Sequence, residues 1–269
     1  MKAKPYVGIT GPVSASEVES IVKKFYEAWY NMGTKHIPML GFLVSYKSLN
    51  NQPTQNRRYP PLNSLKELLM DADDRVLRMI HYNTREPGLA NQVQTLFNKD
   101  DLYNDNLCRA IQFNIVWPDA KEVDKIKRSM PDLTMVLQLS QKAMENKSDK
   151  EIVNKIKEYG TAINYALIDP SGGQGKEFDF EKSVDIYNEI SAKCPLITVG
   201  FAGGFTGDNV YSKVKSIIKK IGRNDFLGRD DFCIDAEGGL RDKLSETYGD
   251  DLLNMDKVKK YLDAASSIL

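Results

Sequence analysis

The segment Tyr165-Ala-Leu-Ile-Asp-Pro-Ser-Gly-Gly-Gln-Gly-Lys-Glu-Phe-Asp179 decides how the rest of the chain is interpreted. It begins with a short apolar run, typical of a buried strand, and the run ends at Asp169. A glycine-rich loop follows at residues 172–176, and then a helical pattern begins. Main-chain N–H groups in such a loop can approach an anion closely, and Lys176 adds a positive charge. The segment predicts an acid or base beside a phosphate-binding loop, although an ordinary glycine turn is the alternative for the loop alone.

Two common nucleotide-binding motifs are excluded by the residues around this loop. A P-loop requires glycine at position 170 and Ser or Thr after the lysine, but the chain has Pro170 and Glu177. The dinucleotide-binding pattern G-x-G-x-x-G, started at Gly173, requires a third glycine where Phe178 stands. The predicted anion is therefore not a nucleotide bound by either motif.

The composition predicts one domain over residues 1–269. A chain of 269 residues with 41% hydrophobic residues can bury a large core, and α/β barrels of this size are routinely single domains. Basic and acidic residues balance at 37 each, so no basic excess indicates nucleic acid as a partner. We expect an anionic small molecule to be bound by local groups.

Cysteine and histidine usage points to a reduced, cytoplasmic protein without a metal site. Three cysteines lie far apart without CxxC spacing, which predicts buried thiols. Two histidines are too few for a histidine-rich metal site. We find neither a signal-peptide pattern nor an 18-residue apolar span, so no membrane partner is expected. We also expect no cofactor, and the sequence gives no indication of the number of subunits.

Apolar runs alternate with helical patterns along the whole chain. Strands are predicted at residues 5–9, 37–44, 75–82, 108–116, 133–139, 165–169, 196–201 and 231–236. Helices are predicted at about 14–33, 62–72, 89–98, 118–128, 151–159, 180–192, 208–221 and 256–267. Strand–helix alternation implies a parallel sheet, and this number of repeats fits a closed (β/α)8 TIM barrel.

Glycine pairs follow the sixth, seventh and eighth predicted strands. In such barrels the chemistry lies at the C-terminal ends of the strands, and phosphate often binds after strands seven and eight. A helix start at Asp208 would add N–H groups and a favourable dipole. The recurrence favours a phosphate site over chance turns. The predicted phosphate-binding residues are Gly172, Gly173, Gly175, Lys176, Gly203, Gly204, Gly238 and Gly239.

Several of these segments resemble those of a known family. Residues 167–179 resemble the leucine–aspartate strand and GGxGKxFDW loop of phosphoribosylanthranilate isomerase, a barrel enzyme of tryptophan biosynthesis. Residues 202–210, Ala-Gly-Gly-Phe-Thr-Gly-Asp-Asn-Val, resemble its AGGLxPxNV segment. Weaker similarities are residues 234–238 to VDVSSG, 41–59 to GFVF and KSxRYI with extra residues inserted, and 111–113 to VQLHG. The resemblance spans most of the chain and is densest in the last 110 residues.

The resemblance implies a cofactor-independent Amadori rearrangement of a small phosphorylated substrate. In that reaction an acid protonates the sugar ring oxygen and a base removes the C2 proton. The matching residues imply Asp169 as the general acid, Asp235 as a further catalytic carboxylate and Arg58 as the ligand of a substrate carboxylate. Val7, in Pro5-Tyr-Val-Gly-Ile-Thr10, stands where the family has its cysteine base. Either another base serves, or the reaction differs, or the barrel has lost isomerase activity.

Each candidate residue has a structural alternative. Asp169 could cap the following loop, and Arg58 could be a solvated loop arginine, with Arg57 in its role. Asp235 and Glu237 are possible substitute bases, or one of them could pair with Lys176 or Arg241. The acidic pair Asp250–Asp251 is predicted to be a solvated turn.

Polar residues on the middle strands are predicted to contact the substrate or to fill the barrel. His81 ends the third strand and is the histidine placed to titrate near neutral pH, unless it is a core residue. Gln112, Asn114 and Gln138 could give neutral hydrogen bonds to a substrate. We predict an isomerase, with a phosphate-ligand-binding or regulatory barrel, or a related isomerase or lyase acting on another phosphosugar, as the alternatives.

Overall fold

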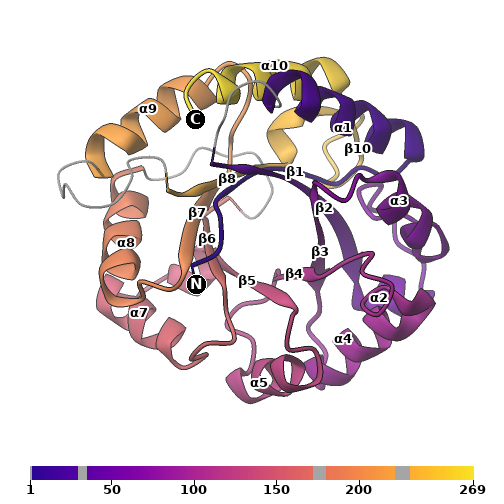
Figure 1. The fold of residues 1–269 in the computed structure, drawn as a ribbon, viewed down its shortest axis with the longest axis horizontal. Helices are drawn as coiled ribbons and strands as arrows, with labels where there is room; N and C mark the ends of the chain where they lie inside the picture. Colours follow the sequence, from indigo (N-terminus) through magenta and orange to yellow (C-terminus); the bar gives the residue numbers. More distant parts are fainter. Residues whose placement is uncertain (1, 30–34, 172–179, 222–230) are drawn as a thin grey trace.

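A closed barrel of parallel strands forms the centre of the molecule (Figure 1). The computed structural model describes residues 2–29, 35–171, 180–221 and 231–269. The strands follow one another around the ring, and β1 pairs with β8 to close it. Their bounds are β1 (Tyr6–Thr10), β2 (Ile37–Ser45), β3 (Leu77–Asn83), β4 (Ala110–Phe113), β5 (Thr134–Ser140), β6 (Tyr165–Asp169), β7 (Thr198–Ala202) and β8 (Cys233–Ala236). The predicted TIM barrel is confirmed.

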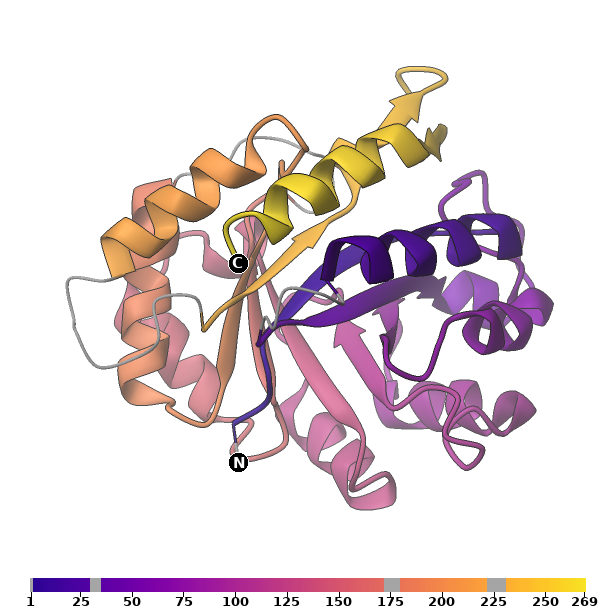
Figure 2. The same ribbon diagram turned by 45° about the horizontal axis from the view of Figure 1, so that its top comes forward.

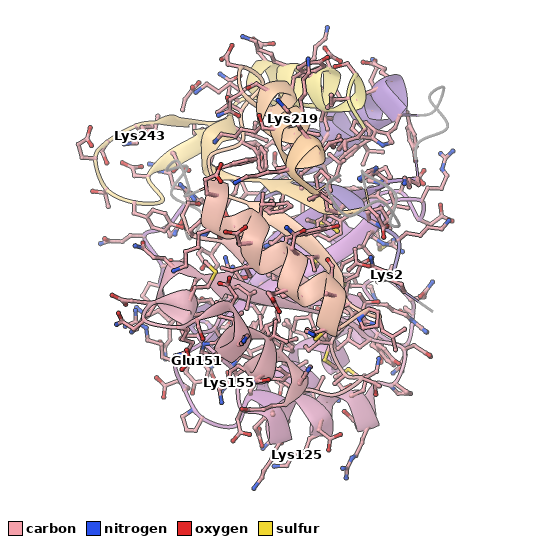
Figure 3. All side chains as sticks on the ribbon, turned by 90° about the vertical axis from the view of Figure 1, so that its left-hand side faces the viewer. Lys2, Lys125, Glu151, Lys155, Lys219 and Lys243 are labelled. Carbon is pink, nitrogen blue, oxygen red and sulfur yellow. The ribbon has the colours of Figure 1, made fainter. Side chains whose placement is uncertain are left out.

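Helices surround the barrel as an outer ring (Figure 1). Their charged side chains face outward, as Glu151 and Lys155 do on α7 (Figure 3). Ser148 and Glu151 form the capping box that starts this helix. The helices are α1 (Ala15–Trp29), α2 (Tyr46–Leu49), α3 (Leu65–Asp71), α4 (Leu89–Asn98), α5 (Ala120–Ser129), α6 (Gln141–Met144), α7 (Asp149–Lys157), α8 (Phe180–Lys193), α9 (Val210–Ile221) and α10 (Met255–Ser266), with the short 3₁₀ segments η1 (Leu62–Ser64), η2 (Lys99–Asp101) and η3 (Gly238–Leu240).

The strands divide the buried side chains between the barrel interior and the helix layer. Successive residues of a strand face opposite sides, so each strand contributes to both. The interior apolar cluster comes mainly from the first halves of the strands, and Tyr6 and Tyr165 pack there with ring centroids 5.4 Å apart. This filling leaves the C-terminal ends of the strands to carry polar inward-facing residues. The cluster comprises Tyr6, Met39, Met79, Ala110, Val136, Tyr165, Leu167, Ala202 and Cys233.

An antiparallel hairpin that the sequence did not predict follows β8. It consists of β9 (Arg241–Lys243) and β10 (Asp251–Leu253). The hairpin projects from the barrel at the end opposite the N-terminus (Figure 2), and Lys243 stands well away from the helices (Figure 3). Each of these strands has three residues, too few to show the alternation of apolar and polar side chains by which a sequence indicates a strand.

Ion pairs connect this hairpin to the long loop before α3. The Arg57 side chain pairs with Asp250 at 2.8 Å, and its main-chain N–H donates to the Gly249 carbonyl at 2.9 Å. The next residues form a second pair, Arg58 with Asp251, at 2.6 Å. The prediction of a solvated turn is wrong for Asp251, which is buried because two guanidinium groups surround it.

Replacing the two neighbouring aspartates separately should show that only the buried pair stabilises the fold. Asp251→Asn leaves two buried guanidinium groups without their shared counter-charge, and we expect a loss of about 3 kcal/mol in unfolding free energy. Asp250→Asn breaks an exposed pair and should cost less than about 1 kcal/mol. Urea denaturation measures both, and equal midpoints for the two variants would contradict the assignment.

Candidate active site at the barrel mouth

A cavity of about 190 Å³ lies at the C-terminal ends of the barrel strands. Its lining is rich in carboxylate, amide and glycine residues, so it offers hydrogen-bond acceptors and donors to a polar ligand. Many of the predicted site residues meet here, although they come from six different strands and their turns. The lining residues are Leu43, Tyr59, His81, Asn83, Gln112, Asn114, Gln138, Leu167, Asp169, Ser171, Ala202, Gly203, Gly204, Asp235, Glu237, Gly238 and Tyr248.

Asp169 ends β6 with its side chain fixed by hydrogen-bond donors. Gln138 Nε2 donates to Oδ2 at 2.6 Å, while the main-chain N–H and hydroxyl of Ser171 donate to Oδ1 at 3.1 and 2.8 Å. The contacts with Ser171 show that Asp169 organises the turn that follows it. Asp169 also lines the cavity. Donors of this kind stabilise an ionised carboxylate.

Asp235 on β8 has an environment of the opposite kind. Its side chain is buried, and its described side-chain donor is Thr10 Oγ1, at 3.1 and 3.2 Å from the two carboxylate oxygens. Burial raises the pKa of Asp235 well above its ordinary value, and the nearby carboxylates of Glu237 and Asp169 raise it further. The protonated form of Asp235 is therefore favoured.

His81 and Gln112 form the polar side of the cavity opposite these carboxylates in the ring order. Burial lowers the pKa of His81 to about 3, so the imidazole is neutral near pH 7. Gln112 Nε2 donates to Asn114 Oδ1 at 2.8 Å and to His81 Nδ1 at 3.3 Å, which assigns the proton of the ring to Nε2. Within the described part of the chain, His81 Nε2 and Gln112 Oε1 have no hydrogen-bond partner. A bound molecule could use both.

Gly41 on β2 allows the groups on either side of it to approach each other. A Cβ at this position would lie 2.6 Å from His81 Nε2 and 2.6 Å from Thr10 Oγ1. Any side chain here would displace the imidazole or the hydroxyl.

The turns after β6, β7 and β8 contact one another, as the phosphate hypothesis requires. Gly203 and Gly204 have positive φ, +102° and +63°, and a Cβ on Gly203 would lie 2.8 Å from Ser171 Oγ, just after β6. Gly239 packs directly against the Phe205 carbonyl in the turn after β7 and does not line the cavity. The predicted residues Gly172, Gly173, Gly175 and Lys176 lie outside the described residues.

Arg58 does not line the cavity but forms ion pairs beside it. Its Nε donates to both oxygens of Asp251 at 3.0 and 3.1 Å, and its Nη2 donates to Asp251 Oδ2 at 2.6 Å. Its Nη1 donates to Glu237 Oε1 at 2.6 Å. The sequence proposed Lys176 or Arg241 as the partner of a strand-eight carboxylate, whereas Glu237 is bound by Arg58. The predicted role of Arg58 toward a substrate carboxylate conflicts with these pairs.

Val7 faces the helices rather than the cavity. It belongs, with Ile9, to the apolar cluster that includes helix residues, and its partner on β8 is Ile234. The adjacent inward position is Gly8, which is registered with Asp235. Thr10, further along β1, donates to Asp235, whereas the side chain at position 7 packs in the outer apolar cluster and does not line the cavity.

The described residues contain no cluster of three or more His, Cys, Asp or Glu side chains suited to holding a metal ion. The cysteines are free and buried, as predicted, and burial raises the pKa of Cys108 to about 11. Over the same residues, no helix has the length and apolar character needed to cross a membrane.

Solved structures of phosphoribosylanthranilate isomerase share this fold. The enzyme from Thermotoga maritima is 14% identical over 98% of this chain and 99% of its own, with a TM-score of 0.61. The Thermus thermophilus enzyme is 13% identical over 98% and 100%, with a TM-score of 0.62. A third, solved in complex with reduced 1-(o-carboxyphenylamino)-1-deoxyribulose 5-phosphate, is 14% identical over 98% and 99%, with a TM-score of 0.58. No protein-family model and no curated protein matched the sequence. At this identity the likeness establishes the fold.

Replacing Asp235 by asparagine should stabilise the protein at neutral pH. An ordinary aspartate ionises near pH 4, so the folded wild type retains a proton that the unfolded chain releases, and its stability falls as pH rises above about 4. Asparagine carries no such proton and should raise stability by about 1 kcal/mol near pH 7, with little gain at about pH 4. Thermal unfolding at both pH values measures this, and a less stable variant at pH 7 would contradict it.

Proposed function

We propose that this barrel isomerises a phosphorylated ribosylamine to the corresponding aminoketose phosphate, as its structural neighbours' name describes for the anthranilate derivative. The supporting observation is that Asp169 and Asp235 line one cavity whose edge is formed by the glycine turns after β7 and β8. The phosphorylated ligand in one neighbouring structure is consistent with a phosphosugar here. The turns would hold the phosphate, and the carboxylates would transfer protons at the sugar.

The reaction needs only proton transfers. An acid protonates the ring oxygen, and the bond from C1 to that oxygen breaks to give a C1=N iminium. A base removes the proton on C2, the electron pair of that C–H bond forms the C1=C2 bond of an enolamine, and the C1=N π pair moves onto nitrogen. The C2 hydroxyl then loses its proton to become the ketone, while C1 gains one. A hydrogen has moved from C2 to C1, and no external oxidant or reductant is consumed.

The environments of the two carboxylates support a particular division of roles. The sequence assigns the acid to Asp169, whereas the contacts of the two carboxylates support the reverse assignment, which we propose here. The donors to Asp169 favour its ionised form, whereas burial favours a proton on Asp235. The proposed resting state therefore has Asp235 as the acid and Asp169 as the base. His81 Nε2 and Gln112 Oε1 are suited to donate to and accept from substrate hydroxyl groups.

Substituting each carboxylate by its amide tests the proposal. Asp169→Asn and Asp235→Asn should each lower kcat/KM by about 10²–10⁴-fold, because each removes one proton-transfer group. Binding of an aminoketose phosphate should survive in both variants. Asp263→Asn, on the exposed face of α10, is the matched control. Wild-type turnover in the Asp169 variant would contradict the proposal.

A barrel that binds the phosphate but has lost turnover is the second candidate, because Val7 stands at the family's cysteine position. The Val7 side chain faces the helix layer, and Val7→Cys exchanges one buried hydrophobic side chain for another of similar volume. The variant should therefore keep an isomerisation rate within about twofold of wild type. A large gain of isomerase activity would instead support the degenerate enzyme.

Thermal-shift measurements with other phosphosugars test the third option, a related isomerase or lyase.

A further inference from the structure

The guanidinium of Arg58 is already bound on several sides. Asp251 accepts from Nε and Nη2, and Nη1 donates to Glu237 at 2.6 Å and to the Tyr248 hydroxyl at 3.3 Å. The Tyr248 ring also covers the guanidinium, with Cζ 4.5 Å from the ring centroid. The Arg58 side chain is only 5% exposed. A substrate carboxylate could reach Arg58 only by displacing one of these groups.

The neighbouring arginine offers no replacement. Arg241 is 2% exposed at its side chain, its Nη1 donates to Asp251 at 3.2 Å, and its Nη2 donates to the Gly11 carbonyl. Asp251 therefore sits between the two guanidinium groups and belongs to both. Neither Arg58 nor Arg241 is among the described residues that line the cavity.

The carboxylates already paired with Arg58 and Arg241 disfavour a substrate carboxylate at these two guanidinium groups. Glu237 and Asp251 already pair with the guanidinium groups of Arg58 and Arg241, and the Asp169 carboxylate is near enough to raise the pKa of Asp235 and of Glu237. Glu237 lines the cavity, and its carboxylate accepts a hydrogen bond from Arg58 Nη1 at 2.6 Å. A further carboxylate would add like charge in a buried space, whereas a hydrogen-bond donor would meet an acceptor.

We propose that Glu237 sets substrate specificity at this corner: it takes the place of a substrate carboxylate on Arg58 and selects an uncharged, hydrogen-bond-donating N-substituent. This inference rests on the proposed function, since it names the class of ribosylamine phosphate used. A substrate with a carboxylate on its N-substituent and one with an uncharged N-substituent would carry the same phosphate group. A carboxamide or amine fits where an anthranilate derivative carries its carboxylate.

Three ligands that differ at one group test the inference. Reduced N-aryl aminodeoxyribulose 5-phosphates made from 2-aminobenzoate, 2-aminobenzamide and aniline are titrated calorimetrically into the full-length protein. We expect the carboxamide to bind at least about tenfold more tightly than the carboxylate, because the latter meets Glu237. Glu237→Gln should tighten binding of the carboxylate ligand about tenfold, and so reduce the ratio between the affinities for the carboxamide and the carboxylate. Glu246→Gln, on a side chain 97% exposed at the hairpin, should change neither.

The outcomes separate this inference from the proposed function. Equal or tighter carboxylate binding by the wild type overturns the specificity inference while leaving a phosphosugar isomerase in place. Failure of all three ligands to bind overturns the proposed function, and the specificity inference with it. If Glu237→Gln does not fold, the wild-type ratio alone decides.

Discussion

The closure of the parallel ring between β1 and β8 is the constraint on which the site depends. It places Thr10 against Asp235 and aligns the inward residues of neighbouring strands in layers. The lower layers are apolar and fill the barrel, so the polar residues collect at the mouth. Buried polar groups normally find partners, and two of the exceptions among the described residues, His81 Nε2 and Gln112 Oε1, belong to side chains that line the cavity.

Charge balance gives the site its individual character. The hairpin β9–β10 carries Asp251 beside the barrel mouth, where it pairs with both Arg58 and Arg241. Glu237 adds a second carboxylate to Arg58 from the turn after β8. The hairpin thus supplies a carboxylate beside the cavity, and the proposed substrate specificity rests on this balance of charges. One scaffold can carry different sites in this way.

The sequence predicted the barrel well because its signals are local. Apolar runs and their flanking glycines located the strands to within a few residues, and Asp169, Asp235, His81 and Gln112 do share one cavity. Contacts across long separations could not be predicted in this way: Arg58 and Asp251 are 193 positions apart. The direction of Val7 was also inaccessible, because the phase of a strand depends on where its pairing begins.

The central claim is that the two carboxylates and the glycine turns act on one phosphosugar. A crystal structure of the protein with the reduced aniline-derived aminodeoxyribulose 5-phosphate tests it most directly. We expect the phosphate to lie against Gly203, Gly204 and Gly238, with C1 and C2 of the sugar between Asp169 and Asp235. A phosphate bound elsewhere, or a sugar out of reach of both carboxylates, would contradict it.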